Sequence, residues 1–137
     1  MNATNNQYQW IVDDQGPIAL IVSACFTTDK SVFFTKPEME QQLGIIKHPK
    51  GAIIQAHDHR AVERTINSCP ECLILRRGSC EMTLYDRRRN KLSDHLLNEG
   101  DIVLLLAGGH GFRMLDDCEL IETRAGAFPG DSGKERF

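Results

Sequence analysis

The sequence of 137 residues lacks the features that mark membrane, secreted and disulfide-rich proteins. No apolar run approaches the roughly 20 residues that a membrane-spanning helix needs. The polar N-terminal stretch MNATNNQYQW has neither the basic region nor the apolar region of a signal peptide. The five cysteines are odd in number and irregularly spaced, which argues against a disulfide framework. We therefore expect a cytoplasmic protein with reduced thiols and no membrane partner.

The chain also lacks a large basic surface. Its formal net charge is -3, and its main basic cluster is Arg87–Arg89, followed by Asn90 and Lys91. A nucleic-acid-binding domain usually carries a larger basic stripe. We therefore expect no nucleic-acid partner, and we interpret residues 86–91 as a charged hairpin turn.

Helical patterns are scarce, whereas short β-type runs recur along the whole chain. With 41% hydrophobic and 26% charged residues, the composition is that of one globular domain with a real core. The only helix-like piece is residues 36–42, a turn or two at most. The predicted strands are residues 9–12, 18–26, 32–35, 43–48, 52–57, 63–67, 72–77, 81–85, 95–97, 102–106, 111–115 and 119–124. Regularly spaced short strands indicate an all-β sandwich or barrel.

The stretch GAIIQAHDHRAVERTINSCPECLILRRG, residues 51–78, carries the clearest chemical signal. On a strand, His57 and His59 would point to the same side, with about 7 Å between their positions. Neutral imidazole is a ligand for zinc, copper, iron and nickel, and an added carboxylate extends the range to manganese. Most such pairs are nevertheless surface or hydrogen-bonded histidines, so a metal site is indicated only if the surrounding residues supply the other ligands.

Two longer patterns around these histidines resemble the two motifs of the cupin superfamily. Gly51 and the histidines form G-x5-H-x-H, and NEGDIVLLLAGGHGFRML presents a Gly-Asp turn, an apolar strand, a glycine pair and His110. The resemblance covers residues 51–115 and implies an antiparallel barrel, a double-stranded β-helix similar to a jelly roll. The second motif departs from the family pattern because Leu106 replaces its proline, the spacing to His110 is one residue shorter, and the trailing asparagine is absent.

The resemblance implies that one divalent transition metal is held by His57, His59, His110 and a glutamate. Two glutamates compete for the last position. Glu63 has the family spacing from the histidines, and Glu71 has the E-x6-G spacing to the glycine of the same motif. Pro70 before Glu71 is typical of a strand start, where a missing amide hydrogen is harmless. We favour Glu71, with Glu63 as the alternative, and the candidate metals are Zn, Fe, Mn and Ni.

Two further features bear on the site. Cys69 and Cys72 form a C-x-x-C that we interpret as reduced thiols at a strand entrance, since a redox pair normally opens a helix. Cys69 shares strand parity with Glu71, which would put a thiol near the metal. The C-terminal GAFPGDSGKERF is rich in turn residues, as mobile tails are. It also looks like the ending of a group of small cupins associated with surface-polysaccharide or sugar-nucleotide pathways.

Three functions are compatible with the sequence. The first is a metal-binding cupin that acts on a small oxygen-rich metabolite, as an isomerase or an oxygenase. The second is a metal-independent sugar-nucleotide isomerase or epimerase that uses its histidines for proton transfer, with Arg60, Arg64 and Tyr85 binding the phosphates and sugar. The third is a non-catalytic module that binds a small molecule.

We expect one cupin domain over residues 1–137, with its motif core at 51–115 and a tail at 126–137. Open sheet edges favour pairing between chains, and members of the family often pair or exchange edge strands. The expected partners are therefore a small-molecule ligand and a second copy in a homodimer.

Overall fold

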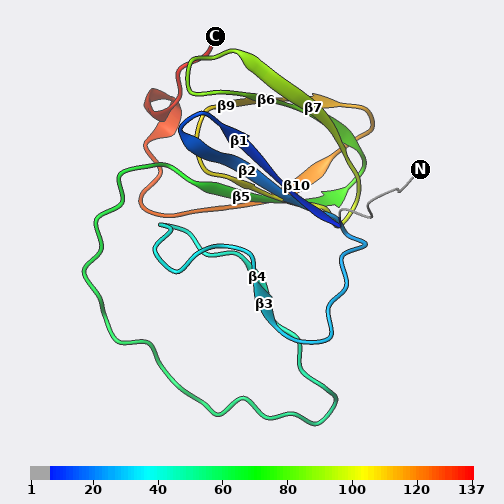
Figure 1. Ribbon diagram of the computed structural model, residues 1–137, viewed down its shortest axis with the longest axis vertical. Helices are drawn as coiled ribbons and strands as arrows, with labels where there is room; N and C mark the ends of the chain where they lie inside the picture. The colour runs from blue at the N-terminus through cyan, green and yellow to red at the C-terminus, as the bar shows by residue number, and fades with distance from the viewer. Residues whose placement is uncertain (1–6) are drawn as a thin grey trace.

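The computed structural model describes residues 7–137, which form ten β-strands and one short 3-10 helix (Figure 1). One sheet has the strand order β1 (Tyr8–Asp13), β2 (Gly16–Val22), β8 (Ile102–Leu105), β5 (Glu71–Arg77) and β10 (Glu119–Arg124). A second sheet has the order β7 (Lys91–Leu97), β6 (Cys80–Tyr85) and β9 (Gly109–Met114). A two-residue ladder joins β3 (Val32–Phe33) to β4 (Gly44–Ile45), and the 3-10 helix η1 covers Gly130–Gly133. All strand pairs are antiparallel, so the prediction of an all-β chain is confirmed.

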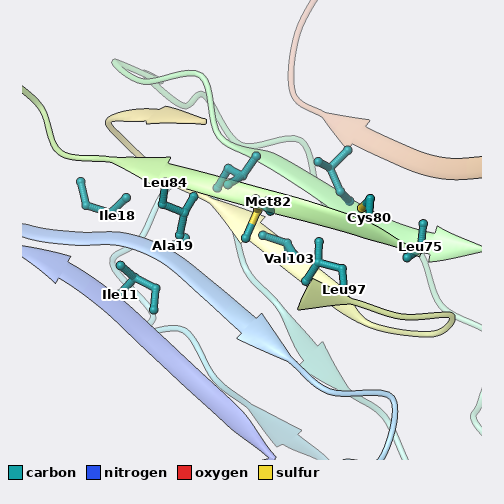
Figure 2. Close-up of a cluster of buried hydrophobic side chains, with 11 residues drawn as sticks. Ile11, Ile18, Ala19, Leu75, Cys80, Met82, Leu84, Leu97 and Val103 are labelled. Atoms are coloured by element: carbon teal, nitrogen blue, oxygen red, sulfur yellow. The ribbon is translucent and has the colours of Figure 1, made fainter. Parts of the chain in front are cut away.

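The five-stranded and three-stranded sheets share one hydrophobic core. Alternate residues of a strand face the same side of its sheet, and β6 shows this with Cys80, Met82 and Leu84, all fully buried. These side chains pack against residues of the other sheet, as Figure 2 shows. The cluster comprises Ile11, Ile18, Ala19, Leu73, Leu75, Cys80, Met82, Leu84, Leu97, Val103 and Leu105. The face of each sheet that carries these side chains is therefore its inward face.

The outer face of the five-stranded sheet is covered by residues 26–45, the part of the chain that contains β3 and β4. Leu20, Val22, Cys72 and Leu104 are buried there against side chains that include Phe26, Phe34, Leu43 and Ile45. The ring centroids of Phe26 and Phe34 are 5.0 Å apart in an edge-to-face arrangement. Residues 36–42, which the sequence analysis treats as a helical piece, form turns and bends and no helix. We call residues 26–45 the β3–β4 region.

Residues 46–69 form a long excursion, which we call the arm. It contains neither a strand nor a helix, and every residue in it is exposed. Figure 1 shows the arm leaving the β3–β4 region, passing through a wide loop and returning to β5. The predicted strands at residues 52–57 and 63–67 are therefore wrong for the single chain, because nothing in the described part of the chain pairs with them.

Outside the arm, the predicted strands match observed ones within a few residues. The prediction that a strand starts next to Pro70 is confirmed, since β5 begins at Glu71. Gly78 opens the turn between β5 and β6 with φ +84°, and a Cβ there would lie 2.4 Å from the carbonyl oxygen of Asp117. This glycine of the E-x6-G pattern is therefore required by backbone conformation and by close approach. Within residues 7–137, no helix has the length and apolar character needed to cross a bilayer.

The predicted hairpin turn at residues 86–91 is confirmed between β6 and β7. The Asp86 carboxylate accepts hydrogen bonds from the backbone N–H groups of Arg88 and Asn90, both at 2.8 Å. Each of the three adjacent arginines contacts a carboxylate elsewhere in the chain. Arg87 pairs with Asp13, Arg88 with Asp14 at 2.6 Å, and Arg89 with Glu135 at 2.9 Å. The basic cluster thus ties this hairpin to the β1–β2 turn and to the C-terminal tail.

Candidate metal centre

β5 places Glu71 on the inward face of the five-stranded sheet. Leu73 and Leu75, two and four residues further along the strand, belong to the core between the sheets. Glu71 has the same parity and therefore points to the same side. Its side chain is 17% exposed, so it lies at the rim of the core and retains access to solvent.

β9 brings His110 to Glu71 from the opposite sheet. Phe112 packs against the core cluster, and His110 shares its face of the strand. His110 Nε2 lies 3.5 Å from Glu71 Oε2, and the His110 side chain is 33% exposed. Two of the four predicted ligands, which are 39 positions apart in the sequence, are thus brought together.

The environment of His110 favours the neutral imidazole. Burial lowers its pKa below the ordinary 6.5, and this effect outweighs the opposing influence of the Glu71 and Glu122 carboxylates. The imidazole is therefore mostly uncharged at pH 7, so its contact with Glu71 joins a carboxylate to a neutral ring. A neutral ring nitrogen can serve as a metal ligand or as a proton acceptor.

Arg124 is a third charged residue of this site that the sequence analysis missed. It lies opposite Glu71 in the pairing of β10 with β5, with Nη1 3.7 Å from Glu71 Oε1. Its Nε donates a 2.6 Å hydrogen bond to Glu122 Oε1, and its guanidinium lies 5.3 Å from the Phe128 ring centroid. The sequence held one sign of this role. Leu120, Glu122 and Arg124 alternate along one strand and so share a face, and Leu120 packs against the core.

A cavity of about 820 Å³ opens beside Glu71 and His110. Its walls come from the entrance of β5 at Cys69, from the β6–β7 hairpin, from the glycines around His110 and from residues 133–137. Ligand cavities of roughly 300–1,000 Å³ are typical for small molecules. Cys69, just before β5, and Glu71, its first residue, both line this cavity.

The C-terminal tail forms one wall of the cavity, whereas its composition is typical of a mobile segment. The Phe137 ring packs edge-to-face against Tyr85 at 5.1 Å, and the Arg89 guanidinium lies 4.9 Å from its centroid. A Cβ on Gly109 would lie 2.5 Å from the Phe137 ring, so glycine permits this close packing. The tail therefore has a defined place against β6 and β9.

His57 and His59 lie together in the arm and not beside Glu71 and His110. Their ring centroids are 5.2 Å apart, and His57 Nδ1 lies 2.8 Å from the carbonyl oxygen of Gln55. Glu63, the alternative acidic ligand, is exposed in the same segment. The four predicted ligands are thus divided into two pairs within the single chain. No group of three or more His, Cys, Asp or Glu side chains in residues 7–137 is arranged to hold a metal ion.

The Glu71–His110 pair nevertheless fits a divalent metal as half of a ligand set. Two atoms that each lie about 2.1 Å from a tetrahedral ion are about 3.4 Å apart. The 3.5 Å between Glu71 Oε2 and His110 Nε2 agrees with that separation. A carboxylate and a neutral imidazole are also the donor types that Zn, Fe and Mn accept.

Comparisons of the chain with protein-family models, with curated proteins and with solved structures found no match. The function is therefore argued from the geometry and chemistry of the site.

Proposed function

We propose that this chain is a metal-binding cupin in which the two large sheets belong to one antiparallel barrel. The metal is one divalent transition ion, Zn, Fe, Mn or Ni, held by Glu71, His110, His57 and His59. The substrate is a small oxygen-rich metabolite that enters the cavity beside Glu71. The observation that carries the proposal is the 3.5 Å approach of Glu71 and His110 from opposite sheets.

The surroundings of this pair support a reactive site better than a structural ion pair. A buried ion pair usually has both partners charged and hydrogen-bonded, whereas here the lowered pKa of His110 leaves the ring neutral at pH 7. The pair also borders a cavity, so a third molecule has access to it.

The residues around the cavity have distinct roles in this proposal. Glu71 and His110 hold the ion, and Arg124 orients the Glu71 carboxylate from β10. Tyr85 and Lys134 line the cavity and offer hydrogen bonds to substrate oxygens. When bound, a divalent ion of this kind polarises a carbonyl or activates water or dioxygen. The candidate reactions are isomerisation or epimerisation of a sugar derivative, and oxygenation.

Elemental analysis of the purified protein tests the metal directly. We expect close to one transition metal per chain in the wild type, and loss of the metal in Glu71→Ala and in His110→Ala. Glu63→Ala is the matched control and should retain the metal, because the carboxylate beside His110 is that of Glu71 and not that of Glu63. A folded wild-type protein that takes up no metal would contradict the proposal, and the reverse result for the two glutamates would transfer the ligand role to Glu63.

Four basic residues that line the cavity, beside the acidic residues Glu71, Asp86 and Glu135, favour a second candidate, a metal-independent sugar-nucleotide isomerase or epimerase. Arg87, Arg89, Lys134 and Arg136 border the same cavity as His110, and arginine is well suited to phosphate groups. In this case a thymidine- or uridine-diphosphate sugar should raise the melting temperature equally with and without a chelator. His110→Ala should leave the thermal shift and abolish turnover, because the neutral imidazole would be the proton acceptor.

A further inference from the structure

The predicted metal site is divided between two parts of the molecule that do not meet within the single chain. Glu71 and His110 lie between the sheets, and His57 and His59 lie in the arm. Figure 1 shows the arm beyond β3 and β4, whereas β6, β7 and β9 lie on the other side of the five-stranded sheet. The wide loop of the arm thus lies away from β9, whereas the last residue of the arm, Cys69, returns to the cavity beside His110.

Hydrogen bonds tie the two ends of the arm to the β3–β4 region. At its start, the backbone N–H of Lys47 donates to Ser31 Oγ at 2.9 Å, and Lys47 Nζ donates to the carbonyl oxygen of Thr28. At its end, the Glu40 carboxylate accepts the N–H groups of Asn67 and Ser68, at 2.8 and 3.1 Å. All of these acceptors belong to the β3–β4 region. The chain between the two anchors is therefore presented outward.

The middle of the arm has the sequence of a strand that lacks a partner. Residues 53–59 read IIQAHDH, and strand geometry would put Ile53, Gln55, His57 and His59 on one face. Ile53 is 90% exposed and Ile54 is 61% exposed, which is unusual for adjacent isoleucines in a folded chain. Burial against another surface would remove this apolar area from water.

β9 offers a free edge of matching length. It is the last strand of the three-stranded sheet and pairs only with β6 among the described strands. Unpaired edges readily accept a strand from another chain. Residues directly opposite on neighbouring antiparallel strands have Cβ atoms about 4.5–5.5 Å apart. An added strand with His57 and His59 on the inward face would therefore bring their rings to His110.

We propose that residues 53–59 of one copy pair with the free edge of β9 in a second copy, where His57 and His59 complete the site formed by Glu71 and His110. The exchange is reciprocal in a two-fold symmetric dimer, so each dimer contains two composite sites. The identity of the site as a metal centre rests on the function proposed above. The strand exchange rests separately on the anchored arm, its exposed isoleucines and the free edge of β9.

Co-expression of two differently tagged variants tests whether the site is shared between chains. One variant is His57→Ala/His59→Ala, and the other is Glu71→Ala/His110→Ala. Neither homodimer should bind metal. In the heterodimer, isolated through both tags, one site has all four ligands and the other has none. We therefore expect about half of the wild-type metal content per chain.

The remaining outcomes of this experiment overturn the proposal. If the wild type binds metal and the isolated heterodimer binds none, the histidines act within their own chain. If no heterodimer can be isolated through both tags, the chains do not exchange arms. Circular dichroism of each variant confirms that the sheets are intact.

The oligomeric mass separates failure of the strand exchange from failure of the metal assignment. Alternate amides of an edge strand point toward its neighbour. One of two adjacent amides must therefore face β9, and the double substitution Gln55→Pro/Ala56→Pro removes that N–H donor whichever of the two it is. The matched control is Glu63→Pro/Arg64→Pro, in the same arm but outside the paired residues. Light scattering should show that the first variant has half the wild-type mass and that the control is unchanged.

A Gln55→Pro/Ala56→Pro variant that keeps the wild-type mass would overturn the exchange, as would a monomeric wild type. If the wild type binds no metal but this variant halves the mass, the exchange stands and the metal function fails.

Discussion

The paired sheets and the arm differ in what they do with their apolar residues. In the sheets, alternation puts leucines, isoleucines and methionine on shared inward faces, and Leu84, Met82 and Ile18 are fully buried. The arm also has β-type alternation, yet Ile53, Ile54 and Val62 remain exposed. The difference lies in the availability of a neighbouring strand, because a strand is stable only when its backbone groups are paired. A strand-forming sequence in the arm is therefore consistent with a partner strand in another chain.

The two regions should differ most in how much the free energy of unfolding falls when an apolar side chain is shortened to alanine. Leu84→Ala leaves a cavity in a fully buried position of β6 and should reduce the free energy of unfolding by about 2–5 kcal/mol. Val62→Ala in the arm removes an exposed side chain and should change it by less than about 0.5 kcal/mol. Urea unfolding followed by circular dichroism measures both. Equal effects would show that Val62 is buried in solution.

Removal of a buried carboxylate should have the next largest effect. Asp101 Oδ1 accepts the N–H of Ala24 and Oδ2 accepts the N–H of Asn98, both at 2.8 Å. Asp101→Ala leaves these donors without their acceptor and should reduce the free energy of unfolding by about 1–3 kcal/mol. Glu63→Ala in the arm is the control, because the Glu63 carboxylate accepts no hydrogen bond within residues 7–137, and it should be neutral. An unchanged denaturation midpoint for Asp101→Ala would mean that water replaces the carboxylate.

The same contrast explains how far the sequence predicts the structure. Strands in the sheets were predictable because hydrophobic alternation and turn residues such as Asp86 and Gly78 act locally. The start of β5 was predictable because Pro70 restricts its own position in a strand. The association of Glu71 with His110 was expected only from the resemblance to the cupin motifs, which implies that both residues hold one metal, and the structure brings the two side chains within 3.5 Å.

Other features depend on contacts that a single sequence does not display. The arm has strand-like periodicity at residues 53–59, but periodicity does not say which neighbour is present. Arg124 was missed because its role depends on its register opposite Glu71. The packing of Phe137 was missed because the composition of the tail is that of a loop, and the contact depends on the space left by Gly109.

The anchor between Glu40 and the arm should be sensitive to pH. Hydrogen bonds from the Ser68 hydroxyl and the Asn67 backbone lower the pKa of Glu40 below its ordinary 4.5. A lowered pKa means that the anchor is fully present above about pH 4.5 and is lost as the pH falls through the lowered value. We expect the amide protection of Asn67 and Ser68, measured by hydrogen exchange and corrected for intrinsic rates, to fall by less than about tenfold in that window, because exposed groups are screened.

Two substitutions control the anchor experiment. Glu40→Gln keeps an oxygen acceptor without a titratable charge. In this variant the amide protection of Asn67 and Ser68 should be weaker than in the wild type and independent of pH in the same range. Glu38→Gln alters a neighbouring residue whose carboxylate accepts no hydrogen bond within residues 7–137, and it should behave as the wild type. If protection in the wild type does not change with pH, Glu40 does not hold the arm.

The smallest effect concerns the other exposed segment, the tail, which differs from the arm because it packs against its own chain. Gly109→Ala would place a Cβ 2.5 Å from the Phe137 ring, and the ring can move away at a cost below about 1 kcal/mol. Gly111→Ala is the matched control on the same strand, since a Cβ there meets nothing within 4 Å. Carboxypeptidase should therefore remove Phe137 severalfold faster from Gly109→Ala than from the wild type or Gly111→Ala. Equal rates in all three proteins would show that the tail leaves the cavity freely, and the contrast between arm and tail would then disappear.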